Sequence, residues 1–314
     1  MVVRHPHRLP LLALGMLALL TGLWAGLARL GWDVPLPRPG FSSLHGPLMV
    51  SGFLGTLISL ERAVALGRPW AYAAPLLTGL GGVSLIVGAP LLVAQWLMLA
   101  GSLVLVAIFA AIIRRHPALY TFTMGGGSLV WALGNLLWCL GWPVFLVVFW
   151  WAAFLVVTIA GERLELARLQ QVTGAAQATF LLLLGILLTG LLLLGWSYDG
   201  GIRLFGLGLA GLALWLGRHD IARRTVKQAG LTRFIAICLL TGYVWLGISG
   251  LSAMWFGGVP VGPQYDATLH AFFLGFVFAM IFAHAPIIFP AVLGARMAYR
   301  PLFYAHVVLL QVTL

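Results

Sequence analysis

Charged side chains are scarce in this chain, and acidic ones are the scarcest. Lys, Arg, Asp and Glu make up 8% of the 314 residues, Asp and Glu together number 7, and hydrophobic residues reach 62%. The mean hydropathy is +1.05. Soluble globular domains are about 25% charged and about 45–50% apolar. The composition therefore excludes an ordinary soluble fold and indicates an integral membrane protein.

Cysteine is also rare, and its two copies show no ligand spacing. Cys139 and Cys238 both fall in apolar stretches and form no CxxC or zinc-finger pattern. A free cysteine in such a stretch behaves as a small hydrophobic residue. We expect both to serve packing rather than metal binding.

The chain consists mainly of apolar runs of the length that crosses a bilayer as a helix, about 20 residues. Links of only a few residues separate them, which leaves no room for a soluble domain. The runs lie near residues 9–31, 44–66, 71–90, 93–113, 119–141, 143–161, 175–197, 201–217, 233–257 and 267–293. The first is longer than a signal-peptide core and is expected to be a retained helix.

An eleventh apolar run begins at Pro301 and reaches Leu314 after 14 residues. At 1.5 Å per residue it is too short to span the roughly 30 Å core of a bilayer. We therefore predict an all-α, polytopic transmembrane helical bundle that forms a single integral membrane domain over residues 1–314. About 11 helices are visible, and a twelfth is expected beyond Leu314.

The basic residues indicate which side of the membrane each loop faces. With a cytoplasmic N-terminus, 15 of the 18 Lys and Arg residues fall in inner loops and 3 in outer loops. Such a bias is typical of bacterial and other helical membrane proteins and predicts that orientation. The inner set is Arg4, Arg8, Arg62, Arg68, Arg114, Arg115, Arg163, Arg168, Arg218, Arg223, Arg224, Lys227, Arg233, Arg296 and Arg300; the outer set is Arg29, Arg38 and Arg203.

The net charge of +11 does not indicate a nucleic-acid partner, because the basic residues are strung between helices rather than gathered in one patch. The longest polar link, residues 217–233, is the most basic. It fits a surface segment near anionic lipid headgroups, and a solvated loop fits it equally well.

Four of the eight histidines lie in or at the edge of apolar runs, where a polar ring needs a partner inside the protein. They are His45, His270, His284 and His306. His45 and His270 open outside-to-inside runs and are expected near the outer face. In a uniform α-helix, His284 would lie about 21 Å further along the axis from His270 and within about 40° of the same face. His306 is expected at the level of His284.

Two level pairs follow, His45 with His270 and His284 with His306. Neutral imidazoles are good ligands for haem iron and copper, so the pairs are candidate sites for haem, with copper as a further candidate. The alternative is that each histidine only hydrogen-bonds a neighbouring helix. Met49, one turn after His45, is a candidate soft ligand, although core packing is the commoner role of methionine.

Acidic residues and glycines in the apolar runs also allow two readings. Glu61 and Glu162, each followed by an arginine, fit interfacial anchors, and a proton entry towards the inner histidines is the functional alternative. The glycine-rich stretches "GFLG" (52–55) and "MGGGS" (124–128) fit close helix packing, and could also receive a flat macrocycle.

The stretches "LHGPLMVSGFLGTLI" and "TLHAFFLGFVFAMIFAHAPIIFP" resemble the NnrS family of bacterial membrane proteins. The match rests on His45, Met49, Gly52 and Phe53, and on His270 with His284. The resemblance implies about twelve helices, haem and copper, and a link to nitric oxide metabolism. More distantly, the chain is similar to haem-copper oxidase catalytic subunits. The paired adjacent histidines of those oxidases are absent, so proton-pumping oxygen reduction is not expected.

The resulting hypothesis is a multi-pass protein of the bacterial inner membrane that binds haem, and copper as a further candidate, and handles nitric oxide or a related small oxidant. Its expected partners are the lipid bilayer and a small gaseous ligand. Two alternatives remain: a cofactor-free transporter or channel with a histidine proton relay, and a quinol-linked b-type electron carrier. No residue is predicted to be catalytic, and the sequence predicts no oligomeric state.

The charge bias yields a topology prediction. A reporter fused after Arg224 should be active only in the cytoplasm, and one fused after Asp199 only in the periplasm. Opposite results for the two fusions would overturn the helix count and the assignment of the histidines to membrane faces.

Overall fold

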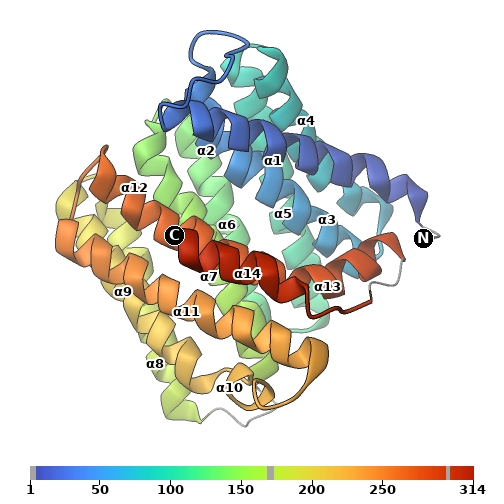
Figure 1. Ribbon diagram of the computed structural model, residues 1–314, viewed down its shortest axis with the longest axis vertical. Helices are drawn as coiled ribbons and strands as arrows, with labels where there is room; N and C mark the ends of the chain where they lie inside the picture. The colour runs from blue at the N-terminus through green and yellow to red at the C-terminus, as the bar shows by residue number, and fades with distance from the viewer. Residues whose placement is uncertain (1–4, 168–172, 295–297) are drawn as a thin grey trace. The chain divides into compact units, whose positions relative to one another are not determined.

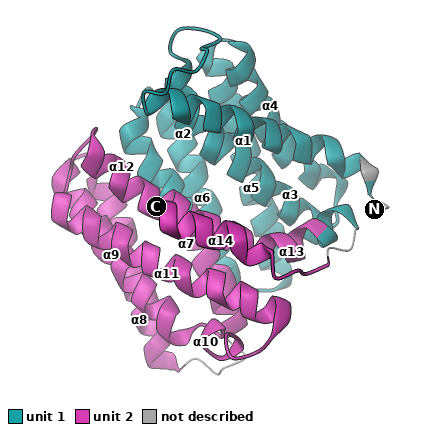
Figure 2. Ribbon diagram, in the orientation of Figure 1, with its two compact units in different colours: residues 1–154, 290–295 teal, residues 155–289, 296–314 magenta. Residues whose placement is uncertain are grey.

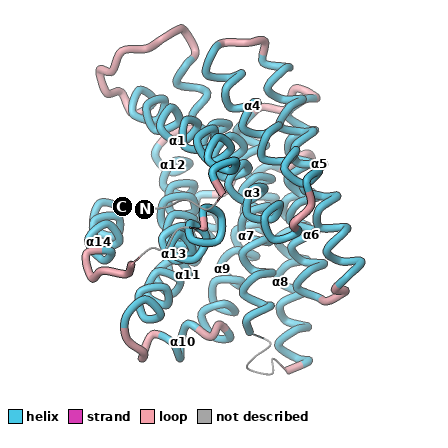
Figure 3. The backbone as a smooth tube through the Cα atoms, turned by 90° about the vertical axis from the view of Figure 1, so that its right-hand side faces the viewer, coloured by secondary structure: helices cyan, strands magenta, loops and turns pink. Residues whose placement is uncertain are grey.

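The computed structural model describes residues 5–167, 173–294 and 298–314. Arg4, Arg168 and Arg296, which belong to the predicted inner set, lie outside the described residues. Within the described ranges, every regular element is a helix (Figure 3). This confirms the predicted all-α class, and it is expected because a backbone in lipid must satisfy its own N–H and C=O groups.

The helices fall where the apolar runs predict them (Figure 1). They are α1 (Leu9–Arg29), α2 (His45–Pro47) continuing into α3 (Gly55–Leu66), α4 (Ala73–Val87), α5 (Leu91–Arg115), α6 (Leu119–Cys139), α7 (Val144–Ala167), α8 (Gly174–Leu193), α9 (Tyr198–His219), the short α10 (Ala222–Thr225), α11 (Gly230–Phe256), α12 (Pro263–His270) continuing into α13 (Ala279–Leu293), and α14 (Phe303–Thr313).

Nine helical spans in the described part of the chain are long and apolar enough to cross a membrane. The protein is therefore a multi-pass membrane protein. The glycine-rich α6 and the short α14 are not among these nine. The sequence predicts ten full spans, so the difference lies in α6, whose three consecutive glycines and Asn135 lower its hydropathy.

The chain forms two compact units (Figure 2). Unit 1 comprises Met1–Phe154 and Pro290–Ala295, and unit 2 comprises Leu155–Phe289 and Arg296–Leu314. The sequence predicts a single domain over residues 1–314. The division falls inside α7 and α13 rather than in a polar linker, and both units consist of membrane-length helices.

A buried polar network holds unit 1 together. Asn135 of α6 accepts hydrogen bonds from Ser51 Oγ at 3.2 Å and from Trp151 Nε1 at 3.0 Å, and Trp131 Nε1 donates to Ser51 Oγ at 3.2 Å. All four side chains are fully buried. Because a polar group in an apolar interior is costly unless it is hydrogen-bonded, the network fixes how these helices face one another.

In unit 2, glycines bring helices into close contact. Gly190 of α8 lies against the backbone of Phe205 in α9, and Gly206 of α9 lies against Gly250 of α11. A Cβ on Gly206 would sit 2.6 Å from the Gly250 carbonyl oxygen. Small residues at such crossings allow the backbone-to-backbone approach on which helix association in lipid depends.

Two helices contain long π-helical segments. The first π segment is Leu48–Leu54, between α2 and α3, and the second is Ala271–Phe278, between α12 and α13. In the first, Pro47 lacks the N–H that would continue the α pattern, and Thr56 Oγ1 donates to the Gly52 carbonyl at 2.6 Å. In the second, Gly275 lies directly under the ring of Trp245 from α11.

The second π segment changes the expected relation between His270 and His284. The estimate of 21 Å and a shared face assumes α-helical geometry for all the intervening residues. Ala271–Phe278 instead makes i→i+5 hydrogen bonds, which place more residues in each turn. The rotation and rise between the two histidines therefore differ from the α-helical values, and a shared face no longer follows from the spacing.

The contact between Gly275 and Trp245 gives a stability prediction. Gly275→Ala places a methyl group 2.4 Å from Cγ of Trp245, so the indole must shift. Overpacking of this kind costs about 1–3 kcal/mol, so the thermal unfolding midpoint in detergent should fall. Gly126→Ala is the matched control, because nothing lies within 4 Å of a Cβ there; it should be neutral or slightly stabilising. Equal midpoints for the two variants would contradict the described packing.

Candidate functional site

In unit 1, His45 is tied to α1 through one ring nitrogen. Its Nδ1 lies 2.8 Å from the carbonyl oxygen of Gly22. The ring also rests on Gly26, where a Cβ would come within 2.8 Å of the same nitrogen. A carbonyl oxygen only accepts hydrogen bonds, so Nδ1 carries the proton, and in the neutral ring Nε2 carries the lone pair.

In unit 2, His270 and His284 repeat this arrangement. His270 Nδ1 lies 2.8 Å from the carbonyl oxygen of Asp266, and His284 Nδ1 lies 2.7 Å from that of Met280. Both partners lie four residues earlier on the same helix. The three histidines thus share one tautomer, in which Nδ1–H is held by a main-chain carbonyl and Nε2 is the basic nitrogen. Histidines that bind metals are commonly oriented in this way.

His45 and His270 have a second feature in common. Each lies shortly before a π-helical stretch: His45 lies three residues before the first π segment, and His270 immediately before the second. π-helical turns are rare and are often found at functional sites. The same combination of a tethered histidine and a π segment therefore occurs once in each unit.

Met49 and the small residues around it are engaged in packing. A Cβ on Gly22 would meet the Met49 sulfur at 2.8 Å, which places this side chain on α1. A Cβ on Gly52 would come within 3.1 Å of the Ala18 Cβ, and Gly55 lies against the ring of Trp131. These contacts favour the packing interpretation of this glycine face.

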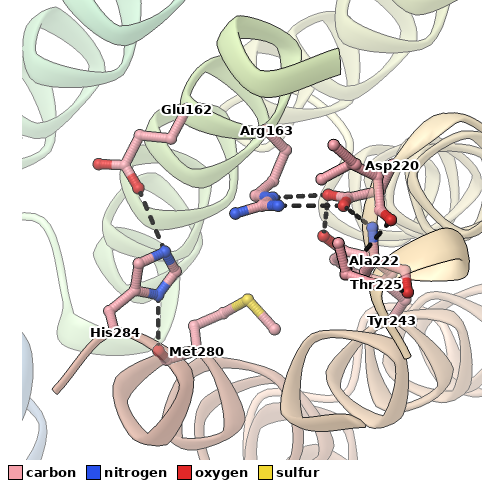
Figure 4. Close-up of polar contacts among 9 residues, drawn as sticks. Glu162, Arg163, Asp220, Ala222, Thr225, Tyr243, Met280 and His284 are labelled. Atoms are coloured by element: carbon pink, nitrogen blue, oxygen red, sulfur yellow. Dashed lines mark hydrogen bonds and ion pairs between the residues drawn. The ribbon is translucent and has the colours of Figure 1, made fainter. Parts of the chain in front are cut away.

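The described neighbours of His284 and His306 differ. His284 Nε2 lies 3.9 Å from Glu162 Oε2 of α7 (Figure 4). The ring of His306 lies edge-on to Phe282, with 4.5 Å between ring centres, and also contacts Phe234. Pairing of His284 with His306 stays a prediction. So does pairing of His45 with His270, because these two belong to different units.

Glu162 and His284 form a pair that can hold a proton. When the ring is protonated, both of its N–H groups face acceptors, the Met280 carbonyl and the Glu162 carboxylate. The sequence favours Glu162 as an interfacial anchor, with a proton entry as the alternative. The contact between Glu162 and His284 fits the proton-entry alternative, in which the carboxylate leads towards an inner histidine.

Beside this pair lies a buried ion pair that the sequence did not reveal. Arg163 Nε and Nη2 donate to the two carboxylate oxygens of Asp220 at 2.5 and 3.0 Å (Figure 4). Asp220 also accepts from the Tyr243 hydroxyl and from the Ala222 amide, each at 2.7 Å. The Asp220 side chain is fully buried, and that of Arg163 is 5% exposed. The available signal was an isolated aspartate directly after an apolar run, within "GRHD".

The described side chains include no multi-ligand metal cluster. Among the residues that the structure describes, no group of three or more His, Cys, Asp or Glu side chains could hold a metal ion. Copper sites in proteins usually combine several such ligands, whereas haem iron needs only one or two axial ligands. A single tethered histidine is therefore sufficient for haem.

Comparison with known proteins places the chain in one family. Residues 8–314 match the family model described as a domain of unknown function, DUF8744. The chain belongs to this family. No curated protein matches it, and no solved structure does. The resemblance to the NnrS proteins stays a prediction.

The ion pair gives a stability prediction with an internal control. Asp220→Leu leaves Arg163 charged and buried, which typically costs about 3–5 kcal/mol, so the thermal midpoint should fall sharply. The double variant Arg163→Leu/Asp220→Leu removes both charges and should recover most of that loss. Asp199→Asn, in the exposed Asp199–Arg203 pair, should have a much smaller effect. A double variant as unstable as the single one would contradict this account.

Proposed function

We propose that this protein is a haem-binding, multi-pass membrane protein of NnrS type, located in the bacterial inner membrane. In this proposal, His45 and His270 are the main haem ligands, and His284 and His306 are secondary ones. Copper is a further candidate at the same histidines. The ligand handled at the haem is nitric oxide or a related small oxidant.

One observation carries the proposal. Three intramembrane histidines each donate Nδ1–H to a main-chain carbonyl, so that Nε2 is the basic nitrogen in the neutral ring. This contact holds the ring in a fixed orientation for coordination. The π segments after His45 and His270 support the same two positions.

Bound haem would supply an iron atom that can take a diatomic gas. The residues of the chain would orient that group: the carbonyls of Gly22 and Asp266 hold the rings of His45 and His270 in position. Met49 packs against Gly22 of α1, which favours a packing role over that of a soft ligand.

A second candidate function is a cofactor-free transporter that relays protons through histidines. The contact between Glu162 and His284 favours it, because a carboxylate can pass a proton to a neighbouring imidazole. The two candidates differ in a simple observable, since only the first requires a pigment.

Spectra of histidine variants test the proposal. The full-length protein purified with haem available during expression should show a haem absorbance band and about one or more haems per chain by pyridine haemochrome assay. His45→Ala and His270→Ala each remove an iron ligand, and should abolish most of that band. His306→Ala should cost less of it.

His116→Ala is the matched control, because His116 is an exposed histidine at the end of α5; its spectrum should equal that of the unmodified protein. Full haem content in both His45→Ala and His270→Ala would overturn the ligand assignment. A colourless, fully folded protein would overturn the haem proposal and favour the transporter.

A further inference from the structure

The connection between α9 and α11 in unit 2 carries a dense set of basic side chains. Five of them lie within residues 217–233, and all five are exposed. They are Arg218, Arg223, Arg224, Lys227 and Arg233. The single acidic residue in this segment is Asp220, which is fully buried. We refer to residues 217–233 as the basic connection.

The charge of Asp220 does not offset these basic residues. Its carboxylate is already paired with Arg163, which comes from a different helix, and accepts two further hydrogen bonds. The exposed surface of the basic connection therefore carries positive charge alone. Within residues 217–233, no exposed acidic side chain offsets the attraction for an anion.

The basic connection is folded rather than extended. Asp220 Oδ1 accepts from the amide of Ala222 at 2.7 Å, and Arg223 Nη1 donates to the carbonyl of Arg218 at 3.1 Å, at the end of α9. The backbone continues in turns through α10, where the amide of Val226 donates to the carbonyl of Ala222 at 2.9 Å. The basic side chains are thus presented from a fixed backbone, which lowers the entropy lost on binding.

The flanking helices place this surface at a membrane boundary. The connection joins two spans of membrane length, Tyr198–His219 and Gly230–Phe256 (Figure 1). A segment between two such spans lies at the level of the lipid headgroups. Ala222 is buried while Arg223, Arg224 and Lys227 are exposed, so the apolar residue faces the protein and the cations face outward.

We propose that the basic connection is a binding surface for anionic phospholipid headgroups. Arginine guanidinium groups and the lysine ammonium donate to phosphate oxygens, and a cluster of basic residues next to a transmembrane helix is the arrangement that anionic lipids prefer. The inference is independent of haem binding, because none of the proposed haem ligands belongs to this segment.

Native mass spectrometry of the full-length protein tests the proposal. The probes are phosphatidylglycerol and phosphatidylcholine, added separately at equal amounts. The unmodified protein should retain more phosphatidylglycerol. Arg224→Gln/Lys227→Gln should lower that retention, on the order of 5-fold for each charge removed. Neither side chain makes a described contact, so the backbone of the connection should be kept.

Arg114→Gln/Arg115→Gln is the matched control. It removes two exposed charges from the end of α5, on the same predicted side of the membrane but outside the basic connection. This control should retain more phosphatidylglycerol than Arg224→Gln/Lys227→Gln does. An equal loss in the two variants would overturn the proposal, because any inner arginine would then have the same effect.

Hydrogen exchange in lipid nanodiscs provides the second measurement. Amides of residues 220–229 should exchange more slowly in discs that contain phosphatidylglycerol than in discs of phosphatidylcholine alone. Equal exchange together with equal retention of the two lipids would overturn the proposal, and would leave the surface to an acidic soluble partner.

Discussion

A polar group inside a bilayer has no water to complete its hydrogen bonds, and most polar contacts of this protein follow from that constraint. In unit 1, Asn135, Ser51 and two tryptophans satisfy one another in an otherwise apolar interior. In unit 2, the carboxylate of Asp220 accepts four hydrogen bonds, two from Arg163, one from the Tyr243 hydroxyl and one from the Ala222 amide. Such networks restrict the helices to one arrangement, because any other would leave a donor or acceptor unpaired.

The same constraint selects the state of the intramembrane histidines. A neutral imidazole has one donor and one acceptor, and a helix offers a carbonyl to the donor at little cost. For His45, His270 and His284, this leaves Nε2 to determine the chemistry of the ring. The groups around Nε2 then distinguish these three histidines, although their rings have the same tautomer. Glu162 faces Nε2 of His284, and a π segment follows His45 and His270.

Hydropathy and length were sufficient to locate the helices. Each predicted run corresponds to a helix, from α1 to α14, because a span of about 20 apolar residues has few alternatives in lipid. The close contacts of Gly52 and Gly55 agree with the packing interpretation, which their small size favoured. The π segments were not predicted, because hydropathy does not report the hydrogen-bond pattern within a helix.

The polar partners in the candidate site could not be predicted from the sequence, because they lie far apart in the chain. Arg163 and Asp220 are 57 residues apart, and Glu162 and His284 lie on helices that are not consecutive. A hydropathy pattern describes one helix at a time and contains no information on which helices become neighbours. The sequence places Arg163 at an inner helix end. Only the tertiary structure shows that its side chain is buried and that Asp220 is its partner.

The separation of Arg163 and Asp220 has a consequence for how the chain is inserted into the membrane. A ribosome adds about 5–20 residues per second, so the 57 residues between them take about 3 to 11 s to synthesise. During that time the arginine has been synthesised and its counter-ion does not yet exist. A long side chain near a helix end can reach the headgroup region while it waits. Its withdrawal into the protein must then accompany the arrival of α9, which makes burial of this charge a late step in the assembly of unit 2.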